Sequence, residues 1–305
     1  MGADDWIVSY LIITRNRADD LSETLRNVDR QRWPRKEIVV VDNCSEDGTE
    51  EVVTRFSGKC ESDCVYFRAD ENLGVSGGRN EAYRLARGDI LVTIDDDAVF
   101  TGDDATEVIC ETFRARREVG ILAFRIVDYH TGALIRDQFP TRRKSRNPNV
   151  EFFTGWFIGA GHAVRKEVFD RAGPYNDFWP YGSEELDVSY RTLDLGYRIL
   201  FTPAVEVRHK VTPAGRITAG TPLNTLLLTH RLKVAALNLP WRYVFTHWLF
   251  WGLAYLVLLA PGNVRVVFGA FRTAHREWKS WMAVRGCIGE EAVAELAAVG
   301  GQLWR

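Results

Sequence analysis

The strongest constraint in this 305-residue sequence is a regular alternation of apolar runs and helical periodicity from Trp6 to about Val127. Apolar runs bounded by polar residues are typical of buried strands, and they cover Ile7–Thr14, Lys36–Asp42, Val65–Arg68, Asp89–Ile94 and Ile121–Val127. Apolar residues at helical spacing fill the intervals Asp19–Gln31, Asp47–Phe56, Ser76–Arg87 and Asp103–Arg117. The alternation predicts an α/β fold, with a mostly parallel sheet and helices on both of its faces.

Polar residues follow four of these strands directly. In sheets of this kind, ligands bind outside the carboxyl ends of the strands. We therefore expect one crevice to be lined by the strand-end residues Thr14, Arg15, Asn16, Arg17, Asp42, Asn43, Asp70, Glu71, Asn72, Asp95, Asp96 and Asp97.

The triplet Asp95, Asp96 and Asp97 is the first candidate metal site. Hard divalent cations prefer oxygen ligands, and alternate carboxylates at a strand end can point the same way. The competing interpretation is an ordinary acidic turn. His209 follows the apolar run Val205–Arg208 and becomes a ligand candidate only if the fold brings it to Asp97.

Two further motifs follow the second and third strands. Asp42 has two interpretations, a hydrogen-bond acceptor for a nucleobase or part of a turn that caps the next helix. In the stretch Asn72–Asn80, Gly77 and Gly78 permit close approach, and Arg79 in the first helical turn is unfavourable unless it meets an anion. This stretch matches neither a phosphate loop nor a dinucleotide-binding fingerprint.

A later helix, predicted over Ser183–Leu195, begins with three carboxylates. Carboxylates at a helix N-terminus are favoured electrostatically, so capping explains them without any function. The functional alternative is that one of Glu184, Glu185 and Asp187 is a general base that reaches an acceptor hydroxyl.

Composition excludes several classes of protein. The 39 basic and 41 acidic side chains give a formal net charge of −2, so we expect no nucleic-acid partner. Five cysteines without framework spacing predict reduced thiols in a cytoplasmic protein. The N-terminal residues Met1 to Trp6 include two Asp and no cationic region, so we expect no secretory signal.

The segment Arg136–Arg146 is strongly basic and interrupted by Pro140. It is either a solvated surface loop or a flap over a polyanionic ligand. Beyond it, Trp156 and Trp179 are candidates for stacking on a ligand, although aromatic side chains equally fill protein cores.

The C-terminal region is helical and rich in aromatic residues. Val244–Ala260 has 17 residues without a charge, whereas a membrane-spanning helix needs about 20. A second stripe (Phe268, Phe271, Trp278, Trp281) is opposed by the cations Arg272, Arg276 and Lys279, a pattern that suits a helix at a membrane interface. The alternatives are packing on the catalytic domain or a partner subunit, and a true membrane span.

Taken in order, the motifs resemble the inverting nucleotide-sugar glycosyltransferases of family two, which have the GT-A fold. The resemblance extends from about Val8 to His209. Its landmarks, in order, are Thr14-Arg15-Asn16-Arg17, Val41-Asp42-Asn43, Asp47-Gly48-Thr49, Asn72-Leu73-Gly74, Gly78-Arg79-Asn80, Asp95 and Asp97, Gly159 and Gly161, Glu184-Glu185 with Asp187, Gly196-Tyr197-Arg198, and His209.

The resemblance implies a role for each matching residue. A cation, Mn²⁺ or Mg²⁺, would bind Asp97, with His209 as a second ligand. The family's base is an Asp where this chain has Glu185, which leaves Asp187 as the alternative base. The nucleotide sugar would contact Thr14, Arg15, Asn16, Asp42, Asn72, Gly78, Arg79, Asp95 and Asp96, and the acceptor side would include Trp156, Gly161, Trp179 and Glu184.

The implied organisation is a catalytic domain over residues 1–215, with a nucleotide-sugar half (1–127) and an acceptor half (128–215), and a C-terminal helical region over 216–305. The implied donor is a UDP, dTDP or GDP sugar. If the C-terminal helices attach to a membrane, we expect the acceptor to be a lipid-linked or cell-envelope glycan at its inner face. A sugar-nucleotide-binding protein that has lost catalysis and a nucleotidyltransferase are the competing hypotheses. A homodimer is also compatible with the sequence.

Overall fold

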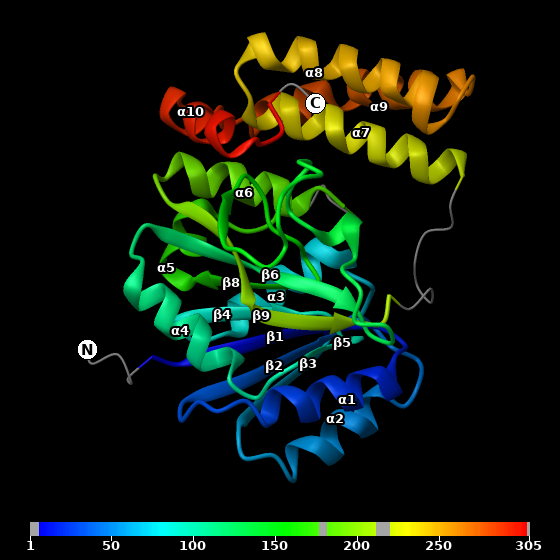
Figure 1. The fold of residues 1–305 in the computed structure, drawn as a ribbon. Helices are drawn as coiled ribbons and strands as arrows, with labels where there is room; N and C mark the ends of the chain where they lie inside the picture. Colours follow the sequence, from blue (N-terminus) through cyan, green and yellow to red (C-terminus); the bar gives the residue numbers. More distant parts are fainter. Residues whose placement is uncertain (1–5, 177–181, 212–219, 304–305) are drawn as a thin grey trace.

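A computed structural model describes residues 6–176, 182–211 and 220–303. A nine-stranded sheet lies at its centre, with helices against both faces and a layer of C-terminal helices stacked beyond one of them (Figure 1). The strands are β1 Val8–Thr14, β2 Lys36–Asp42, β3 Asp63–Arg68, β4 Ile90–Ile94, β5 Ala98–Phe100, β6 Val119–Asp128, β7 Phe152–Thr154, β8 Gly161–Arg165 and β9 Arg198–His209.

The helices alternate with the strands up to β4, and after β9 they follow one another. They are α1 Ala18–Asp29, α2 Thr49–Ser57, α3 Gly74–Leu85, α4 Ala105–Ala115, α5 Lys166–Ala172, α6 Glu184–Asp194, α7 Thr221–Asn238, α8 Trp241–Ala254, α9 Val264–Ala283 and α10 Glu290–Val299. A short 3₁₀ helix, η2, covers Arg136–Gln138, and a π-helical turn, η3, extends α8 over Tyr255–Leu259.

The strand order is β3-β2-β1-β4-β8-β6-β9-β5, with β7 paired to β9. The strands β3, β2, β1 and β4 run parallel, and β6 and β9 run in the same direction because β8 lies antiparallel between β4 and β6. The predicted mostly parallel α/β sheet is therefore confirmed. One consequence positions the site: the ends of β1, β2, β4 and β9 all lie along the same edge.

Alternation along β1 explains why helices cover both faces. Tyr10 and Ile12 are buried on the side where α1 packs with Leu21, Leu25 and Val28, the apolar spacing that predicted this helix. Leu11 is buried on the other side, in the same cluster as Ala82 of α3. A strand buried on both faces is an apolar run, as the sequence shows.

The second half of the sheet departs from the sequence prediction. The sequence predicts separate strands over Tyr197–Phe201 and Val205–Arg208, but they form one strand, β9, with a register shift where Phe124 pairs with Thr202 and Arg125 with Glu206. The bulge keeps the pairing with β6 across a proline-containing stretch. The sequence also predicts a strand over Phe152–Ile158, which is wrong beyond Thr154, whereas β8 and the short α5 were not predicted.

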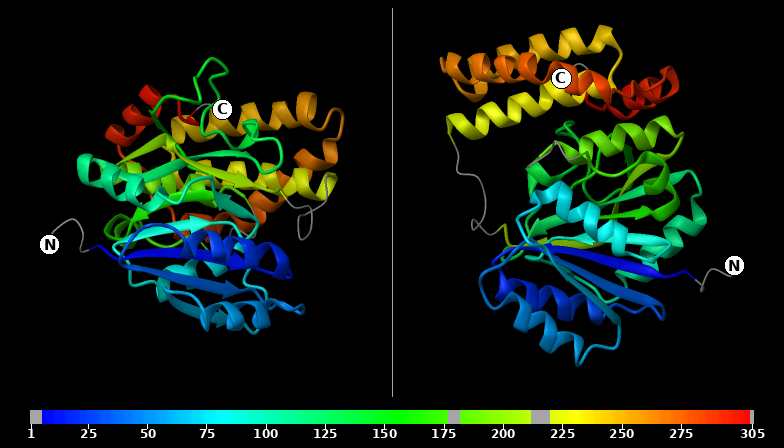
Figure 2. Two further views of the ribbon diagram at one scale, coloured as in Figure 1. Left: turned by 60° about the horizontal axis from the view of Figure 1, so that its bottom comes forward. Right: turned by 180° about the vertical axis from the view of Figure 1, so that it is seen from behind.

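The C-terminal helices share a core with the sheet. One continuous cluster of buried side chains extends from Leu11 of β1 through Tyr190 of α6 to Leu232 of α7 and Trp281 of α9. A polar contact fixes the same junction, because Asn238 Nδ2 at the end of α7 donates to Asp187 Oδ1 of α6 at 2.8 Å. Figure 2 shows α7 between α6 and the outer pair α8 and α9.

Substitution Asn238→Ala tests this junction. Asn238 and Asp187 are both buried, so loss of the amide leaves Asp187 Oδ1 without its donor in a site that water does not reach. We expect the free energy of unfolding to fall by about 1–3 kcal/mol, measured by urea denaturation of the full chain. The exposed Ser280→Ala on α9 is the control and should stay within about 0.5 kcal/mol. Equal stability of the two variants would contradict the proposed docking role.

Candidate active site

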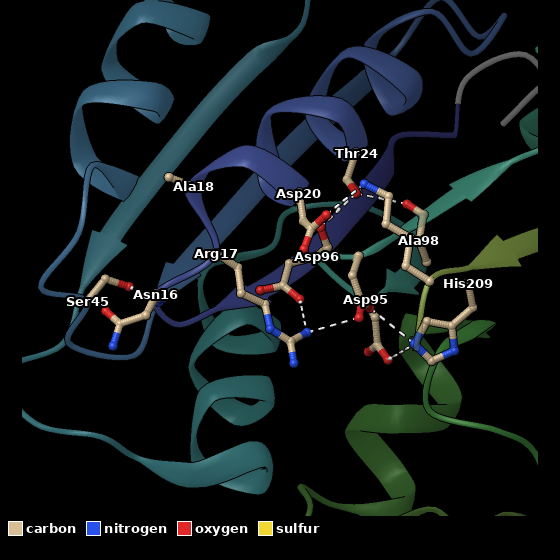
Figure 3. A network of polar contacts seen from close by, with 12 residues as sticks. Asn16, Arg17, Ala18, Asp20, Thr24, Ser45, Asp95, Asp96, Ala98 and His209 are labelled. Carbon is tan, nitrogen blue, oxygen red and sulfur yellow. Dashed lines mark hydrogen bonds and ion pairs between the residues drawn. The ribbon is translucent and has the colours of Figure 1, made fainter. Parts of the chain in front are cut away.

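The acidic triplet forms the turn between β4 and β5. Arg17, from the connection after β1, places Nη1 2.9 Å from Asp96 Oδ1 and 3.1 Å from Asp97 Oδ2 (Figure 3). Thr24 of α1 fixes the backbone of the turn, because its hydroxyl lies 2.9 Å from the carbonyl oxygens of Asp96 and Ala98. The ends of β1 and β4 therefore meet, as the crevice prediction requires.

His209 reaches the same turn from the end of β9. Its Nε2 lies 3.1 Å from Asp97 Oδ1 and 3.7 Å from Asp95 Oδ2. The other ring nitrogen, Nδ1, lies 2.9 Å from Gln138 Oε1 of η2. An amide oxygen only accepts hydrogen bonds, so Nδ1 donates to Gln138 and Nε2 is directed at the carboxylates, where a metal ion held by Asp95 and Asp97 would meet it. The fold therefore brings His209 to Asp97, as its role as a candidate metal ligand requires.

This set of donors fits a divalent cation. Asp95, Asp97 and His209 each offer one ligand atom, and these atoms lie within 4.8 Å of one another. Three carboxylates face one guanidinium here, so negative charge is in excess. Burial raises the pKa of Asp96 to about 7, although Arg17 favours its charged form. A cation that prefers oxygen ligands, such as Mn²⁺ or Mg²⁺, would offset this charge.

The residues expected to hold the nucleotide lie at the same edge, with different exposure. Thr14 is buried, whereas Arg15, Asn16 and Asn72 are exposed. Asn16 ties the first two strand ends together, since its side-chain oxygen accepts from Glu46 N at 2.7 Å. Asn72 caps the start of α3 by accepting from Gly74 N at 3.0 Å.

Asp42 is fully buried and its carboxylate is occupied by protein donors. Ser45 N donates to Oδ1 at 2.8 Å, and the Tyr66 hydroxyl donates to Oδ2 at 2.8 Å. This arrangement matches the capping-turn interpretation of Asp42 and does not test contact with a base. Gly78 is also enclosed, since a Cβ there would lie 2.9 Å from Asn43 Nδ2 and from Ile13 Cγ2, so it allows α3 to approach the strand ends.

A second cluster lies where α3 meets the start of α6. Arg79 Nη1 lies 3.2 Å from both Glu184 Oε1 and Glu185 Oε1. The Glu184 side chain is 4% exposed and that of Glu185 is 19% exposed, so Glu185 is the one a ligand can reach. Burial and the neighbouring Glu185 carboxylate raise the pKa of Glu184, which favours its protonated form.

The two clusters influence each other electrostatically and are linked by a backbone hydrogen bond. Burial lowers the pKa of the Arg79 guanidinium. The Glu185, Glu184 and Asp95 carboxylates are among the neighbours that outweigh burial, so the pKa is raised. Asp95 N also donates to Ala160 O at 3.3 Å, and Ala160 follows the glycine packed against Arg79. The acidic turn and the start of α6 therefore lie close together.

Gly159 makes the close approach possible. A Cβ built on this residue would lie 2.2 Å from both Arg79 Nη2 and Glu185 Oε1. Gly161, two residues later, is the first residue of β8 and is enclosed by Phe124, Ile126 and Val207 at 3.2 Å, so it packs in the sheet. The sequence predicts a tight turn over residues 159–161, and Gly159 is the part of it that contacts the candidate site.

The remaining predicted residues lie apart from the two clusters. Asp187 is buried, and its carboxylate accepts from Asn238 and from Arg191 Nη2 at 2.8 Å. Trp156 is half-buried and packs against the core cluster shared with the C-terminal helices. Trp179 lies outside the described residues.

Three contacts were not anticipated. Arg17 was singled out only as part of a strand end, yet it bridges Asp96 and Asp97. Gln138 and Tyr175 carried no sequence signal. The side-chain amide of Asn80 makes two hydrogen bonds to the backbone of Tyr175, at 2.7 and 2.8 Å. The Arg79 guanidinium lies 5.5 Å from the Tyr175 ring centre.

The basic segment Arg136–Arg146 has structured contacts at both ends. Gln138 in its first turn contacts His209. Arg142 Nη2 donates to Gln302 Oε1 at 3.0 Å, and its guanidinium lies 5.1 Å from the ring centre of Trp251. The segment thus connects the acidic turn to the C-terminal region.

A family model described as Glycosyl transferase family 2 matches residues 9–173, more than half of the chain. The chain belongs to glycosyl transferase family 2. It is 33% identical over 174 residues to an uncharacterized protein from Haemophilus influenzae, an alignment that covers 55% of this chain and 91% of that protein. It is 26% identical over 113 residues to a poly-beta-1,6-N-acetyl-D-glucosamine synthase from Staphylococcus aureus, covering 37% of this chain and 27% of the synthase.

Solved structures of the same fold agree with this assignment. The mannosyltransferase PcManGT from Pyrobaculum calidifontis, in complex with GDP-Man and Mn²⁺, has a TM-score of 0.60 and 21% identity, covering 96% of this chain and 87% of that one. Residues 1–349 of S. aureus TarS, in complex with UDP-GlcNAc, give a TM-score of 0.60 and 16% identity over 91% of this chain and 79% of that one. The expected GT-A fold is confirmed.

Gly159→Ala tests the contact between the glycine and the Arg79–Glu185 pair. The added methyl group occupies the space of both side chains, so they must move. Displacement of about 1 Å in an active site can reduce turnover about a hundredfold, and we expect a loss of this size in sugar-nucleotide turnover with the fold retained by circular dichroism. Gly286→Ala, where no atom lies within 4 Å of the built Cβ, is the control. Parental turnover in Gly159→Ala would show that this pair is not part of the reaction.

Proposed function

We propose that this protein is a metal-dependent, inverting glycosyltransferase that moves a hexosyl or related group from a UDP, dTDP or GDP sugar to an acceptor hydroxyl. The observation that supports it most is the convergence of Asp95, Asp97 and His209 beside the Arg79–Glu185 pair. A cation site and a carboxylate base are the two parts that direct displacement of a nucleoside diphosphate needs.

Asp97 and His209 would hold Mn²⁺ or Mg²⁺, with Asp95 as a third ligand or as a contact to the ribose. The bound cation would neutralise charge on the leaving diphosphate. Support comes from the excess of carboxylates over cations at the turn and from the His209 ring orientation that Gln138 fixes. The structurally similar PcManGT was solved with both GDP-Man and Mn²⁺.

The nucleotide half of the donor would lie along the ends of β1, β2 and β3. The exposed Arg15, Asn16 and Asn72 would contact base and ribose directly. The buried residues of the predicted set would act by shaping this surface: Thr14, Asp42, Gly78 and Asp96 hold the turns in which the exposed residues stand.

Glu185 would be the general base. Its carboxylate is the more exposed of the Glu184–Glu185 pair, whereas Asp187 is engaged by Asn238 and Arg191 at the α6–α7 junction. The acceptor hydroxyl attacks the anomeric carbon on the face opposite the diphosphate while Glu185 accepts its proton. A single displacement inverts the anomeric centre without a covalent intermediate.

The acceptor would be a lipid-linked or cell-envelope glycan, and the protein would work in the cytoplasm at the inner face of the membrane. One relative is named a poly-beta-1,6-N-acetyl-D-glucosamine synthase, although this chain aligns with only 27% of it. All five cysteines are free, as expected in a reducing compartment. Glu184 and Gly159 would form the acceptor side, with Trp179 nearby in sequence, while Gly161 would support it from the sheet and Trp156 from the core. Dimer formation stays a prediction for solution measurements.

A catalytically impaired sugar-nucleotide-binding protein is the second candidate. The observation that favours it is Glu185 in place of the family's Asp, held against Arg79. Nucleotide binding without any turnover would establish this alternative.

A thermal-shift panel of UDP, dTDP and GDP, each with and without Mn²⁺, tests the donor and the cation together. A ligand that binds the folded state raises the melting temperature by mass action, so we expect one nucleotide to stabilise the protein and to do so much more with Mn²⁺. No shift with any nucleotide would count against the proposal.

The variant Asp97→Asn tests the cation ligand. We expect the Mn²⁺-dependent shift to disappear and turnover to fall on the order of a thousandfold, because a cation ligand is lost from the transition state. Asp103→Asn, an exposed change after β5, is the control. Turnover of Asp97→Asn within about tenfold of the parent would reject the metal role.

The pair Glu185→Gln and Asp187→Asn identifies the base. Removing a general base costs about 10²- to 10⁴-fold in rate, so Glu185→Gln should lose turnover and keep the nucleotide-dependent thermal shift. Asp187→Asn should lower stability and keep turnover within about tenfold of the parent, because its contacts are at the helix junction. The reverse result would assign the base to Asp187.

A further inference from the structure

The outer helices carry an unusual concentration of exposed apolar side chains. Among the described residues, 13 large hydrophobic side chains are exposed, and ten of them lie between Trp241 and Phe268. We call this surface the α8–α9 face; it consists of Trp241, Phe245, Leu249, Phe250, Leu253, Val257, Leu258, Leu259, Val264 and Phe268, each between 40% and 74% exposed. Contiguous apolar surface of this kind marks an interaction site.

Most of the face belongs to α8 and the turn that extends it. This helix is apolar on both sides, and one side is exposed. Trp241, Phe245, Leu249, Leu253 and Val257 recur at four-residue spacing and share one side. Residues on the opposite side, Val244, His247, Trp251 and Ala254, are buried against the protein. Figure 1 shows α8 at the outer edge of the helical layer, on the side away from the sheet.

Charge around the face is strongly positive. The segment 241–285 contains six Lys and Arg and a single acidic residue, Glu277, whereas the whole chain has a net charge of −2. Arg242 pairs with Glu290 of α10 and Arg276 with Glu277, which leaves an excess of cations on the segment. The exposed cations Arg265, Arg272, Arg276 and Lys279 stand on α9 beside the stripe. An apolar stripe flanked by cations fits the surface of an anionic bilayer, where side chains enter the acyl boundary and cations meet the headgroups.

The packing of α9 on α8 argues against a membrane span. By length and composition, Trp241–Leu259 is the one helix of the described chain that could cross a bilayer, with mean hydropathy 1.2 and a third of it buried. However, the ring centres of Trp241 and Trp278 lie 5.8 Å apart and those of Trp248 and Phe271 lie 5.7 Å apart, so the two helices run antiparallel. A span would draw Arg272 and Arg276 into the hydrocarbon layer, which strongly disfavours charge.

We propose that the α8–α9 face docks on an anionic bilayer, with α8 lying in the plane of the headgroups. A second copy of the chain is the less suitable occupant, because a twofold contact through this face would bring two sets of cations together. The docking would hold the candidate active site at a fixed height above the lipid surface.

Flotation of the full chain with vesicles tests this proposal. We expect binding to phosphatidylcholine vesicles that contain one third phosphatidylglycerol, weaker binding to pure phosphatidylcholine, and loss of binding at high salt. The double variant Phe245→Gln with Leu249→Gln should abolish flotation, while Val150→Gln, also exposed but outside the face, should not. Both changes are on exposed side chains, so circular dichroism should be unchanged.

A second double variant tests the charge. Arg272→Gln with Lys279→Gln should reduce the partition coefficient about fivefold for each cation removed. The exposed Arg55→Gln on α2 is the matched control and should bind as the parent does.

Four results would overturn the proposal. The first two are no flotation with anionic vesicles and parental binding by Phe245→Gln with Leu249→Gln. The other two are binding that resists both high salt and alkaline extraction, and a lipid-free dimer that this double variant dissociates. The last two would assign the face to a membrane span and to a second copy, respectively. The readout is independent of catalysis, and the nucleotide-dependent thermal shift should be the same in all face variants.

Discussion

The structure of the site depends on the balance of charge at the carboxyl edge of the sheet. Three carboxylates stand in one turn, two of them buried, and Arg17 is the cation that contacts Asp96 and Asp97 directly. The topology creates this situation, because β1 supplies the arginine, β4 supplies the turn and β9 supplies His209 at the same edge. Carboxylates so close together, and partly buried, are stable only with counter-charge. A cation-binding site is the simplest physical reason for keeping them there.

A similar balance governs the second cluster. One guanidinium lies between two glutamates at the start of α6, and burial favours a proton on Glu184. Gly159 and Tyr175 close this cluster, the glycine by leaving room and the tyrosine by a ring beside Arg79 on a backbone that Asn80 holds. Each charged group thus has a neighbour that sets its position or its protonation.

Sequence periodicity predicted the part of the fold that depends on local pattern. The strand bounds Lys36–Asp42 match those of β2, and the apolar spacing of Leu21, Leu25 and Val28 matches the buried side of α1. The antiparallel β8 and the seven-residue α5 were missed because an element this short shows too little periodicity and is fixed by tertiary pairing. Likewise, Asp97 and His209 were found by type and order, whereas Gln138 lies in a basic loop with no pattern that points to a histidine ring.

The shared core has a practical consequence for how the molecule can be divided. The change in architecture between β9 and α7 separates an α/β layer from a helical one, yet Tyr190 of α6 and Leu232 of α7 belong to the same buried cluster. Cutting the chain there would strip a hydrophobic cover from the helix that carries Glu185. The smallest autonomous piece of this family member therefore includes its carboxy-terminal helices, and a trimmed version would lose solubility and the alignment of its reacting groups together.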